Sequence, residues 1–393
     1  MKPLTDITET ERRAHADALF VLLFVTLLLA GAFFTVMLYC SGDTLLRAGL
    51  ESPEALRQLY RRVIFTLGAL GVFWICSCLP LRFYRRAAGF LLAAAVVLAG
   101  FGAVFGTENS SGGTLLSLGS VSLRPAELVF FAVLLYFPVM LCRRAPRMRS
   151  FRQGLLPFLP YMAGLAALLL LQREITAAVV LFLLTAALIT VGGGRLRWLP
   201  AGLLLPAAAL FIAWRASEYF QQQITLWQNP AADLTGRGEQ LLASLRAVEN
   251  GGLLGCGIGG AASSAQTLLA ERGDFMFAAV CEQTGLVGAA LLLAVYFLWV
   301  LRGFRLSVRA ADRYAALTGV GLSAWLGVKV FLAVAAAVNL LPVTGTPLPF
   351  FGAGGSELLL TAAEAGVILS VSREEPLTDE PLTLKSPETE ADV

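Results

Sequence analysis

The sequence has few charged residues and almost no histidine. Asp, Glu, Lys and Arg together make up 15% of the 393 residues, whereas a soluble protein carries roughly 25%. The single histidine, His15, precedes the first apolar run, which excludes a histidine-ligated metal site and a His-based catalytic triad. The net charge of +3 is too small to indicate a nucleic-acid partner.

The six cysteines exclude two further classes of protein. Their spacing matches neither a zinc site nor the disulfide framework of a small secreted domain. Cys40 and Cys256 lie where the chain could face the outside, and the other four read as small hydrophobic residues in or against apolar runs. Those four are Cys76, Cys78, Cys142 and Cys281.

Long apolar runs take the place of the missing charge. Hydrophobic residues make up 57% of the chain and recur in runs close to the ~20 residues that cross ~30 Å of hydrocarbon. The sequence therefore predicts an all-α, polytopic integral membrane protein with about ten transmembrane helices and one long extracytoplasmic loop. Nine helices is the alternative, because three runs are short or interrupted by Pro and Gly. The predicted spans are Ala18–Tyr39, Val63–Leu79, Ala87–Phe105, Glu127–Cys142, Leu155–Leu171, Ile175–Val191, Trp198–Trp214, Phe275–Leu301, Ala315–Val338 and Ser356–Val371.

The distribution of arginine among the loops predicts the orientation of these spans. Alternate loops are rich in arginine, and the positive-inside rule places such loops, and with them both termini, in the cytoplasm. The chain then divides into a cytoplasmic N-terminal segment (1–17), a transmembrane domain (18–373) and a disordered, acidic cytoplasmic tail (374–393). The arginine-rich loops are 82–86, 143–152, 195–197 and 302–313, and the exceptions on the other side are Arg47, Arg57, Arg61 and Arg62.

The long outer loop, about 215–274, is the only large piece outside the membrane. It is rich in Gly, Asn and Gln and ends in a glycine-rich run, 251–260, followed by an acid at a helix entrance. A loop of this length is usually either functional or disordered. We favour a functional loop, and the glycines alone leave a flexible connector as the alternative.

Several ionisable residues lie at the outer ends of the predicted helices, where they could converge on one outward-facing cleft. Charges in apolar spans are costly, so each suggests a function. Glu127, Asp274 and Glu357 also stand at helix N-termini, where capping alone would explain a carboxylate. Arg173 and Glu174 lie in a tight turn and could pair there in solvent. Glu282 is expected about two turns inside its span, where no cap explains it.

Four stretches, in order along the chain, resemble the SEDS family of membrane glycosyltransferases, which includes RodA, FtsW and SpoVE. The strongest is "LLPVTGTPLPFFGAGGSELL" (340–359), followed at the family's distance by "LSVSR" (369–373). The others are "GDFMFAAVCEQTGLVGA" (273–289), "NPAADLTGRGEQLLASLRAVENGGLLGCGIG" (229–259) and "VSLRPAEL" (121–128). Together they extend over most of the chain.

This resemblance implies an enzyme of the bacterial cytoplasmic membrane that polymerises lipid II into peptidoglycan glycan strands on the outer face. The family's catalytic acid maps onto Asp274. A carboxylate at a membrane boundary suits a general base, because partial desolvation raises its pKa. The motifs further imply that the substrate is contacted by Arg124, Glu127, Gln240, Glu282 and Ser356.

The sequence departs from the family pattern at positions where the family has positively charged residues. "SSGGTL" (110–115) replaces a run with an aromatic residue and arginine, and Phe130 replaces a lysine. "QREIT" (172–176) keeps a carboxylate but loses a proline and a glycine, and Arg272 and Gly273 replace the residues before the catalytic acid. Arg124 and Arg272 could restore the charge. Compensation and loss of activity both remain open.

Two charges stand where the family pattern has none. Lys329 lies ~15 Å below the outer end of the ninth span and Glu364 lies ~11 Å below the start of the tenth, at 1.5 Å per residue. The two spans are sequential and antiparallel, so contact at similar depth is expected. Since either charge alone is costly in hydrocarbon, we predict a structural ion pair with no direct part in chemistry.

Cofactor and partners follow from the same resemblance. The resemblance makes no cofactor certain, and a divalent cation, Mg²⁺ or Mn²⁺, is an alternative to Arg124 for stabilising the leaving diphosphate. The expected partners are lipid II, a class B penicillin-binding protein transpeptidase and membrane lipids, with no nucleic acid. The competing functions are a flippase or transporter for a lipid-linked precursor and a non-catalytic scaffold for the transpeptidase. A role in elongation, division or sporulation is left open.

Overall fold

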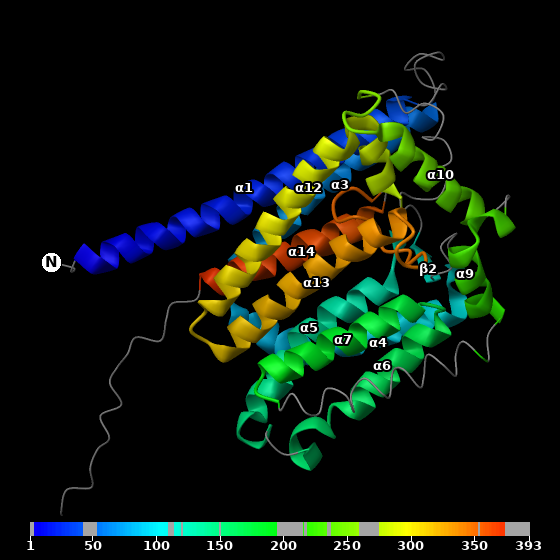
Figure 1. Cartoon of the computed structure of the whole chain (residues 1–393). Coiled ribbons are helices and arrows are strands. Elements are labelled where there is room, and N and C mark those ends of the chain that lie inside the picture. The colour runs from blue at the N-terminus through cyan, green and yellow to red at the C-terminus, as the bar shows by residue number, and fades with distance from the viewer. Residues whose placement is uncertain are drawn as a thin grey trace, which may run out of the picture.

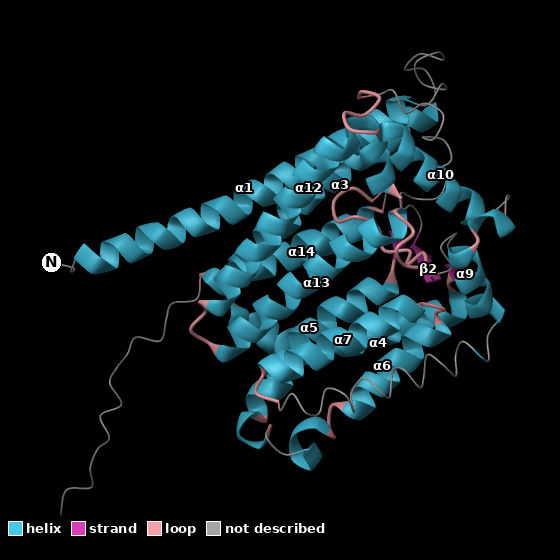
Figure 2. Ribbon diagram, in the orientation of Figure 1, coloured by secondary structure: helices cyan, strands magenta, loops and turns pink. Residues whose placement is uncertain are grey.

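The computed structural model describes residues 4–41, 53–108, 114–118, 121–148, 151–194, 215, 218–233, 237–258, 275–352 and 354–373. Apart from one small sheet, these residues form helices and the turns between them (Figure 2). The predicted span 198–214 lies outside the described residues, as does the acidic tail from Glu374 onward.

Seven of the described helices are long and apolar enough to cross a membrane, and two apolar helices are shorter. The seven are α1 (Leu4–Ser41), α3 (Pro53–Cys78), α4 (Leu81–Phe105), α5 (Pro125–Arg143), α12 (Met276–Val308), α13 (Arg313–Ala337) and α14 (Gly355–Ser372). The shorter helices are α6 (Leu159–Leu171) and α7 (Ile175–Val191). Nine of the ten predicted spans therefore coincide with described helices, which leaves the count of about ten unconfirmed.

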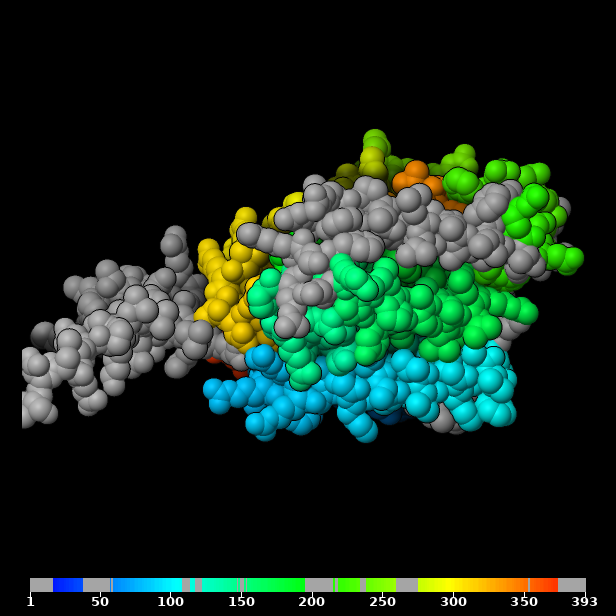
Figure 3. All heavy atoms as spheres, turned by 90° about the horizontal axis from the view of Figure 1, so that it is seen from below, coloured from blue at the N-terminus to red at the C-terminus, as the bar shows by residue number. Residues whose placement is uncertain are grey.

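The long helices lie side by side in two groups (Figure 1). α1, α3, α12, α13 and α14 form one group, in which α14 packs against α3 and α12 against α13. α4, α5, α6 and α7 form the other, and α4 and the α6–α7 hairpin are adjacent bands on the face seen in Figure 3. α13 joins the groups by packing against α5 and α7. α5 and α13 carry more of the buried hydrophobic side chains than any other described helix.

One end of the bundle carries the connecting segments that hold most of the motifs, and we call it the loop end. It is formed by α9 (Glu218–Gln228), α10 (Arg237–Gly251) and a small antiparallel sheet (Figure 1). The sheet has the order β1-β2-β3, with β1 at Thr107–Glu108, β2 at Thr114–Leu118 and β3 at Val121–Leu123. No strands were expected from the sequence. The three strands are only 2, 5 and 3 residues long, too short for a periodic signal.

The described part of the long outer loop includes two helices, α9 and α10. α9 and α10 dock onto the end of α13 through side chains that bind backbone carbonyls. Trp227 Nε1 donates to the Asn339 carbonyl at 3.1 Å, Gln223 Nε2 to the Val343 carbonyl at 2.7 Å, and Ser244 Oγ to the Ala337 carbonyl at 2.8 Å. These bonds satisfy carbonyls at and just beyond the C-terminus of α13, where the helix itself offers no partners.

α12 is two helices separated at Gly285, whose backbone is left-handed (φ 67°). The glycine-rich residues after α10 supply the hydrogen bonds that the break removes. Cys256 N and Gly257 N donate to the carbonyls of Glu282 and Gln283, and Leu286 N and Val287 N donate to those of Gly252 and Leu253. The part after the break, 286–308, is about 34 Å long, enough to span a membrane.

Candidate active site

Arg124 joins three segments at the loop end of the bundle. It caps α5, where Pro125 occupies the first helical position and fixes the entry of the chain. Its side chain is buried. Nη2 lies 3.2 Å from Glu174 Oε1, and Nη1 donates to the Gly345 carbonyl in the loop before α14. A guanidinium in this position ties the start of α5 to two other loops.

Glu174, the partner of Arg124, occupies the N-cap position of α7 and is buried, whereas the sequence suggested a pair with Arg173 in solvent. Burial raises the pKa of this carboxyl above its ordinary value, and the Arg124 guanidinium opposes the shift. The neighbouring Arg173 has a left-handed backbone (φ 60°), and its guanidinium lies 5.6 Å from the Tyr219 ring on α9. The turn thus contacts both α5 and α9.

Glu127 and Glu364 meet at Lys329 in the interior. Lys329 Nζ lies 2.7 Å from Glu127 Oε2 and 3.1 Å from Glu364 Oε2. The structure therefore contains the expected contact between Lys329 and Glu364 and adds a third member from α5. Glu127 is buried and bonded to Lys329 within the protein. The three residues are called the ion cluster below.

Aromatic side chains close the ion cluster on one side. Trp325, one helical turn before Lys329, donates from Nε1 to Glu364 Oε1 at 3.1 Å. Its ring stacks on Phe130 of α5, with centroids 3.8 Å apart and planes 10° apart. Lys329 Nζ also lies 5.0 Å from the Trp325 ring centroid, within range of a cation–π interaction.

The loop before α14, residues 341–352, carries most of the strongest family motif. Side chains from other helices hold it by donating hydrogen bonds to its backbone carbonyls. Arg62 of α3 donates to the carbonyls of Gly352 (2.6 Å) and Phe350, and Tyr296 of α12 donates to that of Pro349. Phe350 has a left-handed backbone (φ 68°), which is rare for a residue with a side chain. Several helices together hold this strained turn in place.

The first turn of α14 also faces this end. Ser356 Oγ donates to the Ser122 carbonyl of β3, which joins α14 to the strand that leads into Arg124. Glu357 is buried in the same turn, consistent with a capping carboxylate. The sheet, α5 and α14 are therefore linked next to the motif loop.

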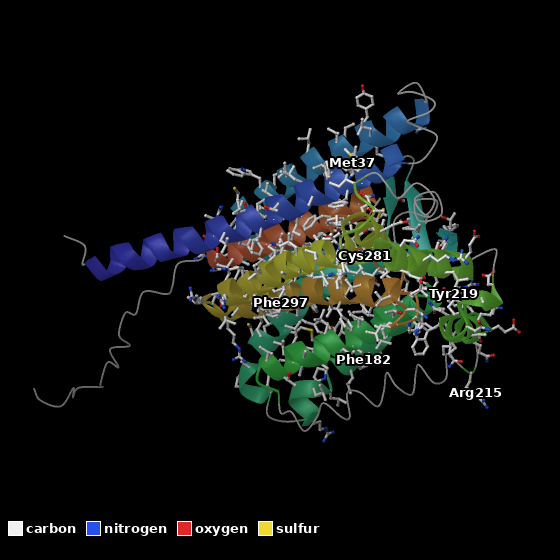
Figure 4. All side chains as sticks on the ribbon, turned by 45° about the horizontal axis from the view of Figure 1, so that its top comes forward. Met37, Phe182, Arg215, Tyr219, Cys281 and Phe297 are labelled. Carbon is white, nitrogen blue, oxygen red and sulfur yellow. The ribbon has the colours of Figure 1, made fainter. Side chains whose placement is uncertain are left out.

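Glu282 and Gln240 belong to a second group, on α12 and α10. Glu282 is buried in the short part of α12 before the break at Gly285 and faces protein. Gln240 is half-buried on α10, which packs against α12. Cys281 beside Glu282 lies towards the loop end, as Tyr219 does, and Phe297 lies nearer the opposite end (Figure 4).

Asp274, the expected catalytic base, lies outside the described residues, as do Arg272 and Gly273. Its role stays a prediction, and so do the substrate-binding roles of Arg124, Glu127, Gln240, Glu282 and Ser356. Phe275, the residue that follows Asp274, is buried at the start of α12. Among the described residues, no group of three or more His, Cys, Asp or Glu side chains is arranged to hold a metal ion.

Sequence reasoning missed two residues of this region, Arg62 and Tyr296. Arg62 appeared only as an exception to the distribution of arginine, which was in fact a signal, because an arginine on the poorly basic side of a membrane protein needs a reason. Its two carbonyl acceptors are about 290 positions away along the chain. Tyr296 lies within an apolar run and gave no signal.

The chain is similar in sequence to proteins of known name over most of its length. A probable peptidoglycan glycosyltransferase FtsW of Coxiella burnetii is 31% identical over 319 residues, covering 80% of this chain and 86% of the relative. Stage V sporulation protein E of Bacillus subtilis is 27% identical over 370 residues, covering 93% and 99%.

Two solved structures share the fold. A chain of a peptidoglycan synthase complex that coordinates polymerization and crosslinking superposes with a TM-score of 0.71 at 24% identity, covering 90% of this chain and 96% of that one. The rod shape determining protein RodA of Thermus thermophilus superposes with a TM-score of 0.62 at 24% identity, covering 89% and 95%. The family model described as "Cell cycle protein" matches residues 20–376. The chain belongs to the FtsW/RodA/SpoVE family of cell cycle proteins.

Proposed function

We propose that this protein polymerises lipid II into peptidoglycan glycan strands at the outer face of the bacterial cytoplasmic membrane. The observation that carries the proposal is the loop end, where Arg124, Glu174 and the motif loop 341–352 are bonded to one another. Relatives that cover most of this chain bear the name peptidoglycan glycosyltransferase. A transporter would instead require a polar path through the bundle, and the buried charges here are bonded to one another.

The orientation follows from charge at the end of the bundle opposite the loop end. Arg85 lies 3.9 Å from Asp312, and Arg313 donates to the Gly192 carbonyl at 2.6 Å. These contacts gather three of the arginine-rich connections at one end, which supports a cytoplasmic location for it and for both termini. The loop end then faces outward.

Glycan extension requires one proton transfer and one leaving group. The acceptor sugar hydroxyl attacks the anomeric carbon of the donor, the bond from that carbon to the diphosphate oxygen breaks, and the diphosphate lipid departs. Asp274 is proposed to take the hydroxyl proton as general base, since it directly precedes in the sequence Phe275, which is buried at the start of α12.

Arg124 is proposed to stabilise the charge on the leaving diphosphate. An arginine fork suits phosphate oxygens, which it binds through two parallel N–H groups. Here the guanidinium is bonded to Glu174 and to the Gly345 carbonyl, and its remaining N–H groups would bind the diphosphate. A divalent cation brought with the substrate is the alternative source of positive charge.

A class B penicillin-binding protein transpeptidase is the proposed partner. A structural neighbour is part of a peptidoglycan synthase complex in which polymerization and crosslinking are coordinated. New glycan strands need crosslinks, so a polymerase and a transpeptidase are useful when held together. The proposed reaction is the same in elongation, division and sporulation, and the proposal does not choose among these processes.

The experiment is polymerisation of lipid II by the purified protein with and without Asp274. Asp274→Asn and Asp274→Ala are expected to abolish glycan polymer while expression and folding stay near wild type, because capping alone is worth only ~1 kcal/mol. Glu239→Gln, an exposed acid on α10, is the matched control and should polymerise normally. If Asp274→Ala polymerises well, the base assignment is wrong and Glu282 is the next candidate. An inactive wild-type protein would favour the scaffold.

A further inference from the structure

Lys329 is the only cation of the ion cluster and is completely buried. Its side chain is 0% exposed, and it reaches carboxylates from two other helices, Glu127 of α5 and Glu364 of α14. Two carboxylates this close repel each other strongly in a medium of low dielectric constant. The cluster therefore depends on a cation between them.

The ion cluster is connected to the loop end through a single turn of helix. Glu127 lies in the first turn of α5, three residues after Arg124, and Pro125 stiffens the step between them. Arg124 in turn bonds to Glu174 and to the Gly345 carbonyl. A shift of Glu127 would therefore move Arg124 and, with it, the motif loop 341–352.

Position 130 lies next to Glu127 along α5 and against Trp325, two residues that contact or border the lysine ammonium. Phe130 follows Glu127 by three residues on α5, so the two side chains share one face of the helix. Its ring lies on Trp325, which donates to Glu364 and borders Lys329 Nζ. A long side chain at 130 can reach the space between the two carboxylates from the α5 side.

We propose that Lys329 is a positioning residue for polymerisation, acting through Glu127 and Arg124 on the motif loop. This rests on the proposed function. We further infer that the cluster needs a positive charge between its two carboxylates, and that this charge can be supplied from α5 as well as from α13. A lysine at position 130 is expected to replace Lys329, because its ammonium would reach Glu127 and Glu364 from the α5 side.

The first test is Lys329→Gln, with two readouts. Turnover of lipid II per folded molecule, measured well below the thermal transition, is expected to fall at least tenfold. Hydrogen exchange at backbone amides of residues 344–352 is expected to rise at least tenfold, although these residues lie outside the ion cluster. A local structural role would raise exchange only in α5, α13 and α14 around the cluster.

The second test moves the charge. Phe130→Lys combined with Lys329→Gln is expected to restore turnover and protection of the loop to within about threefold of wild type. Phe130→Met with Lys329→Gln is the matched control, since methionine has a similar length and no charge, and it should remain impaired. If Lys329→Gln does not fold, recovery of folded protein by lysine and not by methionine leads to the same conclusion.

Three outcomes overturn the proposal: unchanged turnover and loop exchange in Lys329→Gln, equal rescue by lysine and methionine, or rescue by neither. If the wild-type protein fails to polymerise lipid II, the proposed function fails on its own. The exchange measurements then still decide whether Lys329 controls the motif loop.

Discussion

α14 and α3 pack against each other and have almost the same mean hydropathy, 1.3 and 1.4, yet their surroundings are opposite. Of the most apolar stretch of α14, 83% of the residues are buried, whereas only 22% are buried in α3. Average hydropathy therefore identifies a membrane span but does not tell a central helix from a peripheral one.

The two helices differ in where their polar and small residues lie. α14 carries Thr361 and Glu364 in its middle, and Gly366 leaves room for the backbone of Phe73 on α3. α3 keeps its charge at one end and exposes large apolar side chains along its length, including Ile64, Leu67, Trp74 and Ile75. A charge in mid-span indicates a buried helix, because hydrocarbon offers it no partner.

Breaking the ion cluster between the central helices should lower the free energy of unfolding more than any other change considered below. Lys329→Gln leaves Glu127 and Glu364 facing each other and is expected to lower the free energy of unfolding by about 3–5 kcal/mol. Thermal unfolding in a fixed detergent measures it. A loss below ~1 kcal/mol would mean that water reaches the cluster.

A double-mutant cycle sharpens this prediction. Lys329→Gln and Glu364→Ala are expected to couple strongly, with the double variant more stable than the lysine variant alone. Because Glu127 also binds Lys329, adding Glu127→Gln should recover further stability. Additive losses would mean that the residues act separately.

A charge placed on the peripheral helix should have the next largest effect. Leu67 is 63% exposed near the middle of α3, so Leu67→Asp would place a carboxylate in hydrocarbon at a cost of about 2.5–3.5 kcal/mol. Membrane-inserted yield measures this, with Leu67→Val as the control. Normal insertion of the Asp variant would show that this face meets protein or water.

Two glycines, one on α14 and one on α3, allow a direct comparison of the two helices, with the smallest expected effects on stability. A Cβ at Gly366 would lie 2.7 Å from the Phe73 carbonyl oxygen, so Gly366→Ala should destabilise by ~1–3 kcal/mol. Nothing lies within 4 Å of a Cβ at Gly71 on α3, so Gly71→Ala should be neutral or stabilise by up to ~1 kcal/mol. Thermal unfolding compares them, and equal effects would contradict the assignment of α14 as the packed helix.

The sequence predicted the positions of most helices because a membrane span is a local signal of about 20 apolar residues. It also predicted that Lys329 and Glu364 would share a depth. It missed Glu127 as their partner, because a carboxylate at a helix N-terminus already had a local explanation. The bonds of Arg124 to Glu174 and Gly345 join residues 50 and 221 positions apart, which no local pattern encodes.

The break in α12 bears on how the protein is made. Glu282, Gln283 and Gly285 are buried at the break, so the backbone N–H and C=O groups that lose their helical partners there must find others in the protein. Those partners, Gly252, Leu253, Cys256 and Gly257, precede α12 in the chain and leave the ribosome before it. Membrane integration of α12 is therefore coupled to the glycine-rich residues 252–257. A mutation such as Gly255→Val, at a left-handed glycine (φ 79°), should slow the integration of α12 and leave the polymerisation rate of correctly inserted protein unchanged.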